Sequence, residues 1–284
     1  MQSLEGNLAL VHGGPFANIA HGCNSVFATK TAMNIAEYTV TEAGFGSDLG
    51  AEKFMDIVCD NAGLQPNAVV LVASIRSLKM HGGANAKELE QENISALQIG
   101  LENLQQHVNN IKAFGIPLVI AINQFKSDSA AEIKTLSAYF TAHQMEFALT
   151  TLFADGSKGA IDLARKVIKL ASKKVTLKPV YQLTDKLEDK INKIVKRCYG
   201  AAGVEYAPLA LTKLKQLNHR KAYVCMAKTP LTFSDDAKQI MINGPFKIHV
   251  KDLIVANGAN FIIVMAGDIF RMPGLPKVPA ACKM

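Results

Sequence analysis

Residues 116–123 read IPLVIAIN, and residues 68–75 read AVVLVASI. Both stretches are almost wholly apolar and rich in β-branched side chains, which is typical of strands buried on both faces of a parallel sheet. Residues 38–41 and 147–153 are shorter candidate strands of the same kind. These four stretches predict an α/β fold built on a mostly parallel sheet.

Helical patterns lie between these strands. Within residues 87–114, apolar side chains recur at helical spacing and form one stripe along a long helix. The stripe consists of Ile94, Leu97, Leu101, Leu104, Val108 and Ile111. Gly115 suits the position just past the end of this helix, and residues 130–142 and 160–171 predict two more helices. The alternation predicts a sheet with helices on both faces, like one half of a P-loop NTPase.

The pattern changes after residue 174. Residues 184–199 predict a basic amphipathic helix, and residues 207–217 predict another helix. Three short strand patterns are also present, at residues 223–227, 246–250 and 261–265. We therefore expect two domains: a larger one over residues 1–174 and a smaller C-terminal α/β domain over residues 175–284.

Composition narrows the class of protein. The chain has 284 residues, of which 49% are hydrophobic and 19% are charged, as in soluble globular proteins. No apolar run approaches the roughly 20 residues of a membrane span, and no signal segment opens the chain. The five cysteines form no CxxC pair, which favours reduced thiols over disulfides or a metal site. We expect a cytoplasmic protein that contacts no membrane and binds no metal through these residues.

The net charge of +7 comes largely from lysines and arginines within residues 165–197. These side chains are either the solvated faces of two helices or a surface that attracts anions. No aromatic side chains alternate with them, as stacking on bases would require, so we expect no nucleic-acid partner.

Several segments are rich in glycine and polar residues. Residues 12–25 read HGGPFANIAHGCNS, residues 41–50 read TEAGFGSDLG and residues 76–83 read RSLKMHGG. Each is either a ligand-binding loop or a structural turn. The last two follow predicted strands, as do residues 123–128 and 153–159, and ligands bind beyond the carboxyl ends of parallel strands. One crevice is therefore expected to gather these four loops.

Two side chains in RSLKMHGG, Lys79 and His81, are either contacts for an anion or structural groups. Glu42, in TEAGFGSDLG, is either a contact near a phosphate or metal-bound water, or a carboxylate satisfied by backbone amides.

Taken with residues 121–128 (AINQFKSD), 226–236 (MAKTPLTFSDD) and 272–281 (MPGLPKVPAA), these segments resemble formate–tetrahydrofolate ligases almost from end to end and in the same order. The resemblance implies an enzyme of one-carbon metabolism that joins formate to tetrahydrofolate with ATP and Mg²⁺. It also implies a homo-oligomer, typically a homotetramer.

The resemblance implies that Phe45, Phe125, Leu149 and Phe153 hold the pterin ring and that Asn123 contacts the adenine. The chemistry of two of these side chains agrees with those roles. The Asn123 amide can form hydrogen bonds with a purine edge, and the Phe125 ring offers a flat apolar face. The alternative is that Phe125 is a core residue and Asp128 a helix cap. Phe153 stands where the family usually has Trp, so the indole N–H is lost.

The phosphate-binding pattern GxxxxGK[ST] does not occur in these 284 residues. The family normally carries it upstream of the segment that corresponds to residues 12–25. We interpret the chain as the downstream, pterin-binding half of a ligase, clipped at both ends and weakly active or inactive without the N-terminal half. No catalytic residue is assigned. The alternatives are a non-catalytic folate- or purine-binding remnant, an interaction module for a separate P-loop subunit, or half of an unrelated NTPase.

Overall fold

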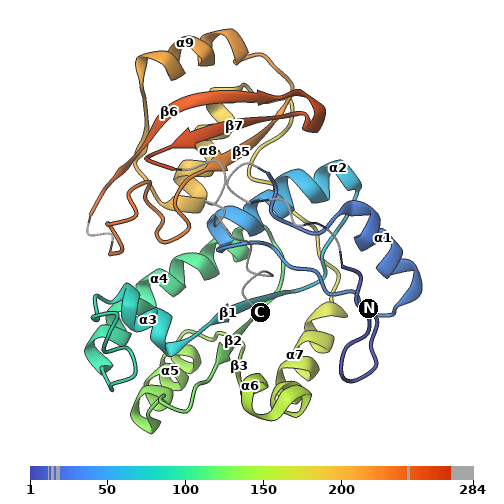
Figure 1. Ribbon diagram of the computed structural model, residues 1–284, viewed down its shortest axis with the longest axis vertical. Helices are drawn as coiled ribbons and strands as arrows, with labels where there is room; N and C mark the ends of the chain where they lie inside the picture. Colours follow the sequence, from blue (N-terminus) through green and yellow to red (C-terminus); the bar gives the residue numbers. More distant parts are fainter. Residues whose placement is uncertain (12, 14–15, 17–19, 242–243, 270–284) are drawn as a thin grey trace, which may run out of the picture.

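The computed structural model describes residues 1–11, 13, 16, 20–241 and 244–269 (Figure 1). One sheet has three parallel strands in the order β1 (Val69–Ala73), β2 (Leu118–Asn123) and β3 (Phe147–Thr150). The middle strand, β2, is buried along its four central residues, as its continuous apolar run predicts. The predicted α/β fold class with a parallel sheet is confirmed.

Helices cover both faces of this sheet. Figure 1 shows α7 (Ile161–Ala171) across the sheet from α4 (Ile94–Ala113) and α5 (Ala130–Ala142). The long helix α4 begins at Asn93, whose side chain accepts a hydrogen bond from the Ala96 amide, and it is followed by Gly115 at φ +78°. On the α4 side an apolar cluster joins side chains of α4 and α5 to Ile120 and Ile122 of β2. These helices agree with the predicted pattern.

Two predictions about local structure are wrong. Residues 76–83 are not a loop, because α3 (Ile75–His81) begins directly after β1. Ser74 starts this helix with a capping box to Ser77, a signal that the glycines at its end obscured. Residues 38–41 form no strand, because within the described chain no neighbouring strand pairs with them and only an isolated bridge joins Cys23 to Ala43.

The N-terminal segment is helical after this bridge. Helix α1 (Val26–Ile35) lies between the two bridged residues, and the π-helical turns η1 (Ser47–Ala51) and η2 (Phe54–Cys59) then lead into α2 (Asp60–Ala62). The sequence did not predict this second helical stretch, because its first turns lie in a glycine-rich segment. After β3 the chain forms α6 (Leu152–Asp155) and the short 3₁₀ turn η3 (Gly156–Ala160).

A second, four-stranded sheet lies in the C-terminal part of the chain. Its strand order is β4 (Gly203–Tyr206), β6 (Lys247–Ala256), β7 (Phe261–Ala266) and β5 (Tyr223–Ala227). Strands β6 and β7 are antiparallel, whereas the other pairs are parallel. Helices α8 (Leu187–Tyr199) and α9 (Pro208–Leu217) pack against it, and η4 (Asn257–Ala259) joins β6 to β7. Strand β4, only four residues long, was not predicted.

Side chains from both halves of the chain share one apolar cluster. It joins Phe54 and Met55 to Ile191, Val224 and Ile262. The expected boundary at residue 174 therefore runs beside a continuous core, and the division into two domains stays a prediction. In the described part of the chain, none of the helices combines the length and apolar character that crossing a membrane requires.

Candidate functional site

The carboxyl ends of β1 and β2 meet at a small hollow. Register pairs Ala73 with Ile122, so the residues that follow the two strands lie side by side. A cavity of about 190 Å³ opens there and is lined by Val72, Ala73, Ser74, Ser77, Asn123 and Phe125. Two of the five predicted site residues, Asn123 and Phe125, are thus brought together at the expected edge of the sheet.

Phe125 is held in place by the residues around it. The guanidinium carbon of Arg76 lies 4.4 Å from the centre of the Phe125 ring. Arg76 also donates to Ser127 Oγ at 3.0 Å and pairs with Glu90 at 3.0 Å. The Phe125 amide donates to Asp128 Oδ2 at 2.8 Å, and burial raises the pKa of the Asp128 carboxyl. Phe125 is half-buried and lines the hollow, so it is more than a core residue.

Asp128 fixes its own loop and does not cap the next helix. Ser129 caps α5 by accepting from the Glu132 amide, and Glu132 bonds back to the Ser129 amide. The loop between β2 and α5 is therefore closed by side-chain bonds at both ends. This gives the Phe125 ring a defined position beside Asn123.

The other three predicted residues lie outside this hollow. Leu149 pairs in register with Ile122 and packs into the apolar cluster beneath α4 and α5. Phe153, on α6, is 93% exposed. Phe45 is 47% exposed, has φ +66°, and its ring meets Phe16 edge-on at 6.1 Å. Their roles in holding a pterin remain predictions.

The loop that presents Phe45 is tightly folded. A Cβ on Gly50 would lie 1.7 Å from the Gly44 carbonyl oxygen, so only glycine fits there. Ser47, which directly follows Gly46 in this loop, shares a 2.7 Å hydrogen bond with His107 Nδ1 on α4. Glu42 is exposed and does not line the hollow.

Lys79 is structural. Its side chain is buried, its ammonium lies 2.8 Å from Glu132 Oε1, and it donates to the Gln91 carbonyl at 2.7 Å. Glu132 also accepts from the Asn93 amide at 3.0 Å. Burial lowers the pKa of His81, which favours its neutral form. The interpretation of Lys79 as an anion contact is therefore wrong.

A buried charged cluster went unpredicted. Asp48, Glu52 and Asp56 follow one another at four-residue spacing and are all buried. Asp48 Oδ2 lies 2.7 Å from the Lys228 ammonium, which belongs to the other half of the chain. The four-residue spacing is the signal that could have placed them on one helical face.

Burial raises the pKa of Glu52 well above its usual value and that of Asp56 to about 7. No hydrogen-bond donor among the described residues reaches either oxygen of Glu52. The raised pKa favours the protonated, neutral form of Glu52 in this buried position. The described residues contain no group of three or more His, Cys, Asp or Glu side chains able to hold a metal.

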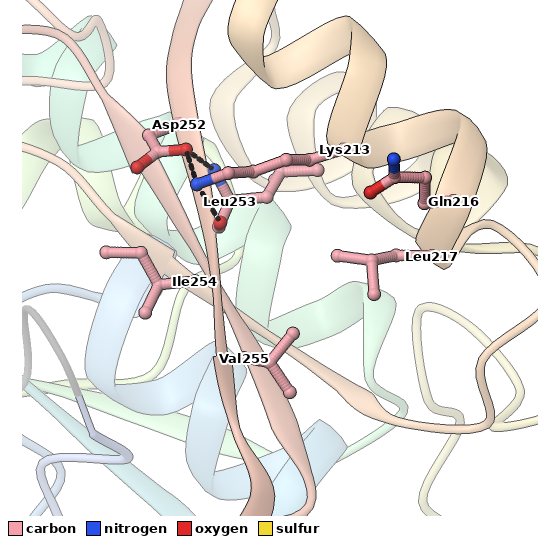
Figure 2. Close-up of a pocket in the computed structure, with 7 residues that line it drawn as sticks. All are labelled: Lys213, Gln216, Leu217, Asp252, Leu253, Ile254 and Val255. Carbon is pink, nitrogen blue, oxygen red and sulfur yellow. Dashed lines mark hydrogen bonds and ion pairs between the residues drawn. The ribbon is translucent and has the colours of Figure 1, made fainter.

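A larger cavity of about 410 Å³ lies between α9 and β6 (Figure 2). Figure 2 shows Lys213 and Gln216 on the helix side facing Asp252 and Ile254 on the strand. Lys213 pairs with Asp252 at 2.5 Å and donates to the Leu253 carbonyl, so its charge is already neutralised. None of the five predicted site residues lines this cavity.

Part of the glycine-rich stretch lies outside the described residues, namely 12, 14–15 and 17–19, as do residues 272–281. In the described remainder, Gly22 has φ +64°, and Ser25 caps α1 by accepting from the Ala28 amide. The end of this stretch is thus the start of a helix.

A family model described as formate–tetrahydrofolate ligase matches residues 1–284. The chain belongs to this family. Formate–tetrahydrofolate ligases of Staphylococcus aureus strains NCTC 8325 and MRSA252 are each 49% identical to it over 287 aligned residues. The alignment covers 100% of this chain and 52% of each relative, so the chain spans about half the length of these curated relatives. The family predicted from the motifs is confirmed.

Proposed function

We propose that this chain forms the pterin-binding part of a formate–tetrahydrofolate ligase, which converts ATP, formate and tetrahydrofolate to 10-formyltetrahydrofolate, ADP and phosphate. The observation that carries the proposal is the hollow where Asn123 and Phe125 meet, in a chain of this family. The other substrates, the cytoplasmic location and a homo-oligomeric state, typically a homotetramer, belong to the same proposal.

The two residues have complementary roles in this proposal. Phe125 offers a flat apolar face to a heteroaromatic ring, and Arg76 packs behind it. Asn123 carries an amide that donates and accepts hydrogen bonds at a purine edge. Phe45, Leu149 and Phe153 complete the proposed pterin set, and Phe153 reaches the ring through a rearrangement of α6, which follows β3, on binding.

The described residues around the hollow do not fit the needs of ATP phosphates and Mg²⁺. Asp128 is the one carboxylate in residues 124–129, and its Oδ2 already accepts a hydrogen bond from the Phe125 amide. Lys79 is buried against Glu132. These residues are therefore not suited to hold Mg²⁺, and we assign the phosphate cradle to a part of the ligase outside this chain.

A coupled assay tests the proposal. The purified chain is supplied with ATP, formate and tetrahydrofolate, alone and with the part of the S. aureus ligase that lies outside the matched segment. The proposal predicts little or no 10-formyltetrahydrofolate from the chain alone and clear formation from the mixture. Strong turnover by the chain alone would contradict the assignment of the cradle elsewhere.

The second candidate is a non-catalytic folate- or purine-binding module. The absence of GxxxxGK[ST] from the sequence and the exposed Phe153 in place of the usual Trp favour it. This candidate would be selected if the mixture binds tetrahydrofolate but does not turn it over. The result counts only when the complementary part is folded and bound to the chain.

A further inference from the structure

The loop that presents Phe45 has a strained backbone. Phe45 has φ +66°, in the left-handed region that a bulky side chain rarely adopts. It lies between Gly44 and Gly46, two residues that give the backbone no stiffness of their own. A residue keeps such a conformation only where the surrounding structure fixes it from several sides. The contacts that fix this loop therefore decide where the Phe45 ring points.

Two side chains of α4 hold the residue that lies two positions after Phe45. Ser47 is buried, and its Oγ lies 2.7 Å from His107 Nδ1 and accepts from Asn110 Nδ2 at 3.1 Å. His107 and Asn110 are three residues apart and so lie on one face of the helix. The Asn110 amide also donates to the Cys198 carbonyl at 2.8 Å, near the end of α8. The Ser47 hydroxyl is thus bonded to a helix face that is itself anchored.

His107 also packs against the backbone of the Phe45 loop. A Cβ on Gly46 would lie 3.0 Å from His107 Cε1, so the imidazole lies directly against the residue that follows Phe45. The ring centre of Phe233, a buried residue in the chain after β5, lies 4.5 Å from that of the imidazole. His107 thus contacts the Phe45 loop and the segment after β5 together.

The imidazole is suited to accept a hydrogen bond from Ser47. Burial lowers the pKa of His107, which favours the neutral ring with one acceptor nitrogen. Asn110 already donates to Ser47 Oγ, so the hydroxyl proton of Ser47 is available to Nδ1. Asp48 and Lys228, which also act on the charge of His107, pair with each other at 2.7 Å. A neutral ring adds no third charge beside this pair.

We propose that His107 is a positioning residue for the pterin site: through Gly46 and Ser47, it holds the Phe45 ring in the orientation that receives the pterin. The inference rests on the proposed function, because it takes Phe45 as a pterin contact. His107 does not line the hollow and acts only through the loop. Without its hydrogen bond the loop relaxes from the strained backbone, and only a fraction of the molecules present Phe45 correctly.

A fluorescent probe at position 45 tests the positioning without any ligand. The chain has no tryptophan, so Phe45→Trp introduces a single indole, and its anisotropy measures how firmly residue 45 is held. The probe is measured alone and combined with His107→Leu, His107→Asn, Ser47→Ala or His219→Leu. His219 is an exposed histidine just after α9 and provides the matched control. Circular dichroism checks that each form is folded.

We expect His107→Leu and Ser47→Ala to lower the anisotropy, because each removes one end of the same hydrogen bond. His107→Asn should restore most of it, since its amide can still bond Ser47 Oγ. His219→Leu should leave it unchanged. Unchanged anisotropy in whichever of His107→Leu and Ser47→Ala is folded would overturn the inference. An equal fall in His107→Leu and His107→Asn would also overturn it, because packing alone would then explain the effect.

Tetrahydrofolate affinity, measured by calorimetry, tests the consequence for binding. His107→Leu should weaken binding about fivefold or more, and it should weaken Phe45→Ala no further, because the residue that His107 positions is then absent. Equal weakening in both backgrounds would overturn the inference. Failure of the proposed function has a different signature. Phe45→Ala would then leave tetrahydrofolate affinity unchanged, while the anisotropy at position 45 would still depend on His107.

Discussion

The guanidinium of Arg76 lies 4.4 Å from the centre of the Phe125 ring, so the helix that follows β1 supports the loop that follows β2. Arg76 also bonds Ser127 in that loop. The two contacts fix the orientation of the aromatic face that lines the hollow. A side chain outside the predicted set thus positions a residue inside it.

Replacement of Arg76 by Met should weaken tetrahydrofolate binding by about two- to thirtyfold, because a partly desolvated cation–π contact contributes roughly 0.5–2 kcal/mol. Arg76→Lys should retain part of the affinity, since a cation remains near the ring. Calorimetry gives the affinities, and thermal melts show whether the fold is intact. Unchanged affinity in Arg76→Met would mean that Phe125 needs no support from Arg76.

The buried pair between Lys228 and Asp48 should be important for stability. Lys228→Met leaves the Asp48 carboxylate buried without its cation and should lower the free energy of unfolding by about 3–5 kcal/mol. The control is Lys247→Met, which removes an exposed pair with Glu205 and should cost less than about 1 kcal/mol. Urea unfolding measures both, and equal small losses would show that the buried pair adds no stability.

The contribution of Asp56 to stability should fall as pH rises from about 4 to 8. Burial raises the pKa of Asp56 to about 7 in the folded chain, whereas an unfolded Asp has a pKa of about 3.9. Between these values the folded chain holds a proton that the unfolded chain has lost, so folding weakens as the proton concentration falls. The same sign applies to Glu52, whose pKa is also raised.

Asp56→Asn is the control for this pH dependence, because an amide oxygen can still accept from the Val180 amide, as Asp56 Oδ1 does at 2.7 Å. Urea midpoints at pH 5 and pH 8 should differ less in this variant than in the wild type. The assignment fails if the two proteins show the same change between the two pH values.

Gly50→Ala should unfold the loop around Phe45 or destabilise the chain by at least about 1–3 kcal/mol, because the new Cβ would lie 1.7 Å from the Gly44 oxygen. Gly203→Ala is the matched control, since its Cβ would meet no atom within 4 Å. Thermal melts compare the two variants. Similar melting temperatures would show that the close approach at Gly50 relaxes without cost.

Much of the fold could be predicted from local pattern. The apolar run that became β2, the stripe of α4 and the capped start of α5 each depend on residues close together in sequence. The segment that became α3 was missed because glycines at its end suggested a loop, although Ser74 and Ser77 formed a capping box. Residues 38–41 have strand composition, yet composition supplies no partner strand.

The candidate site was predicted less completely, because it depends on register and packing. Asn123 and Phe125 follow directly from the end of a buried strand. Leu149 faces the helices because its register pairs it with Ile122, and a shift of one residue would reverse its direction. The buried Asp48–Lys228 pair joins residues 180 positions apart and has no local signal linking its two members.

Calorimetric titration of tetrahydrofolate into three forms of the chain tests the central claim most directly: wild type, Phe125→Ala and Phe27→Ala. Phe27 is an exposed phenylalanine on α1 and serves as the matched control. We predict measurable binding by the wild type, the same affinity in Phe27→Ala, and at least about tenfold weaker binding in Phe125→Ala, since an aromatic stacking face is lost. Equal affinity in all three forms, or none in the wild type even with the complementary part bound, would contradict the claim.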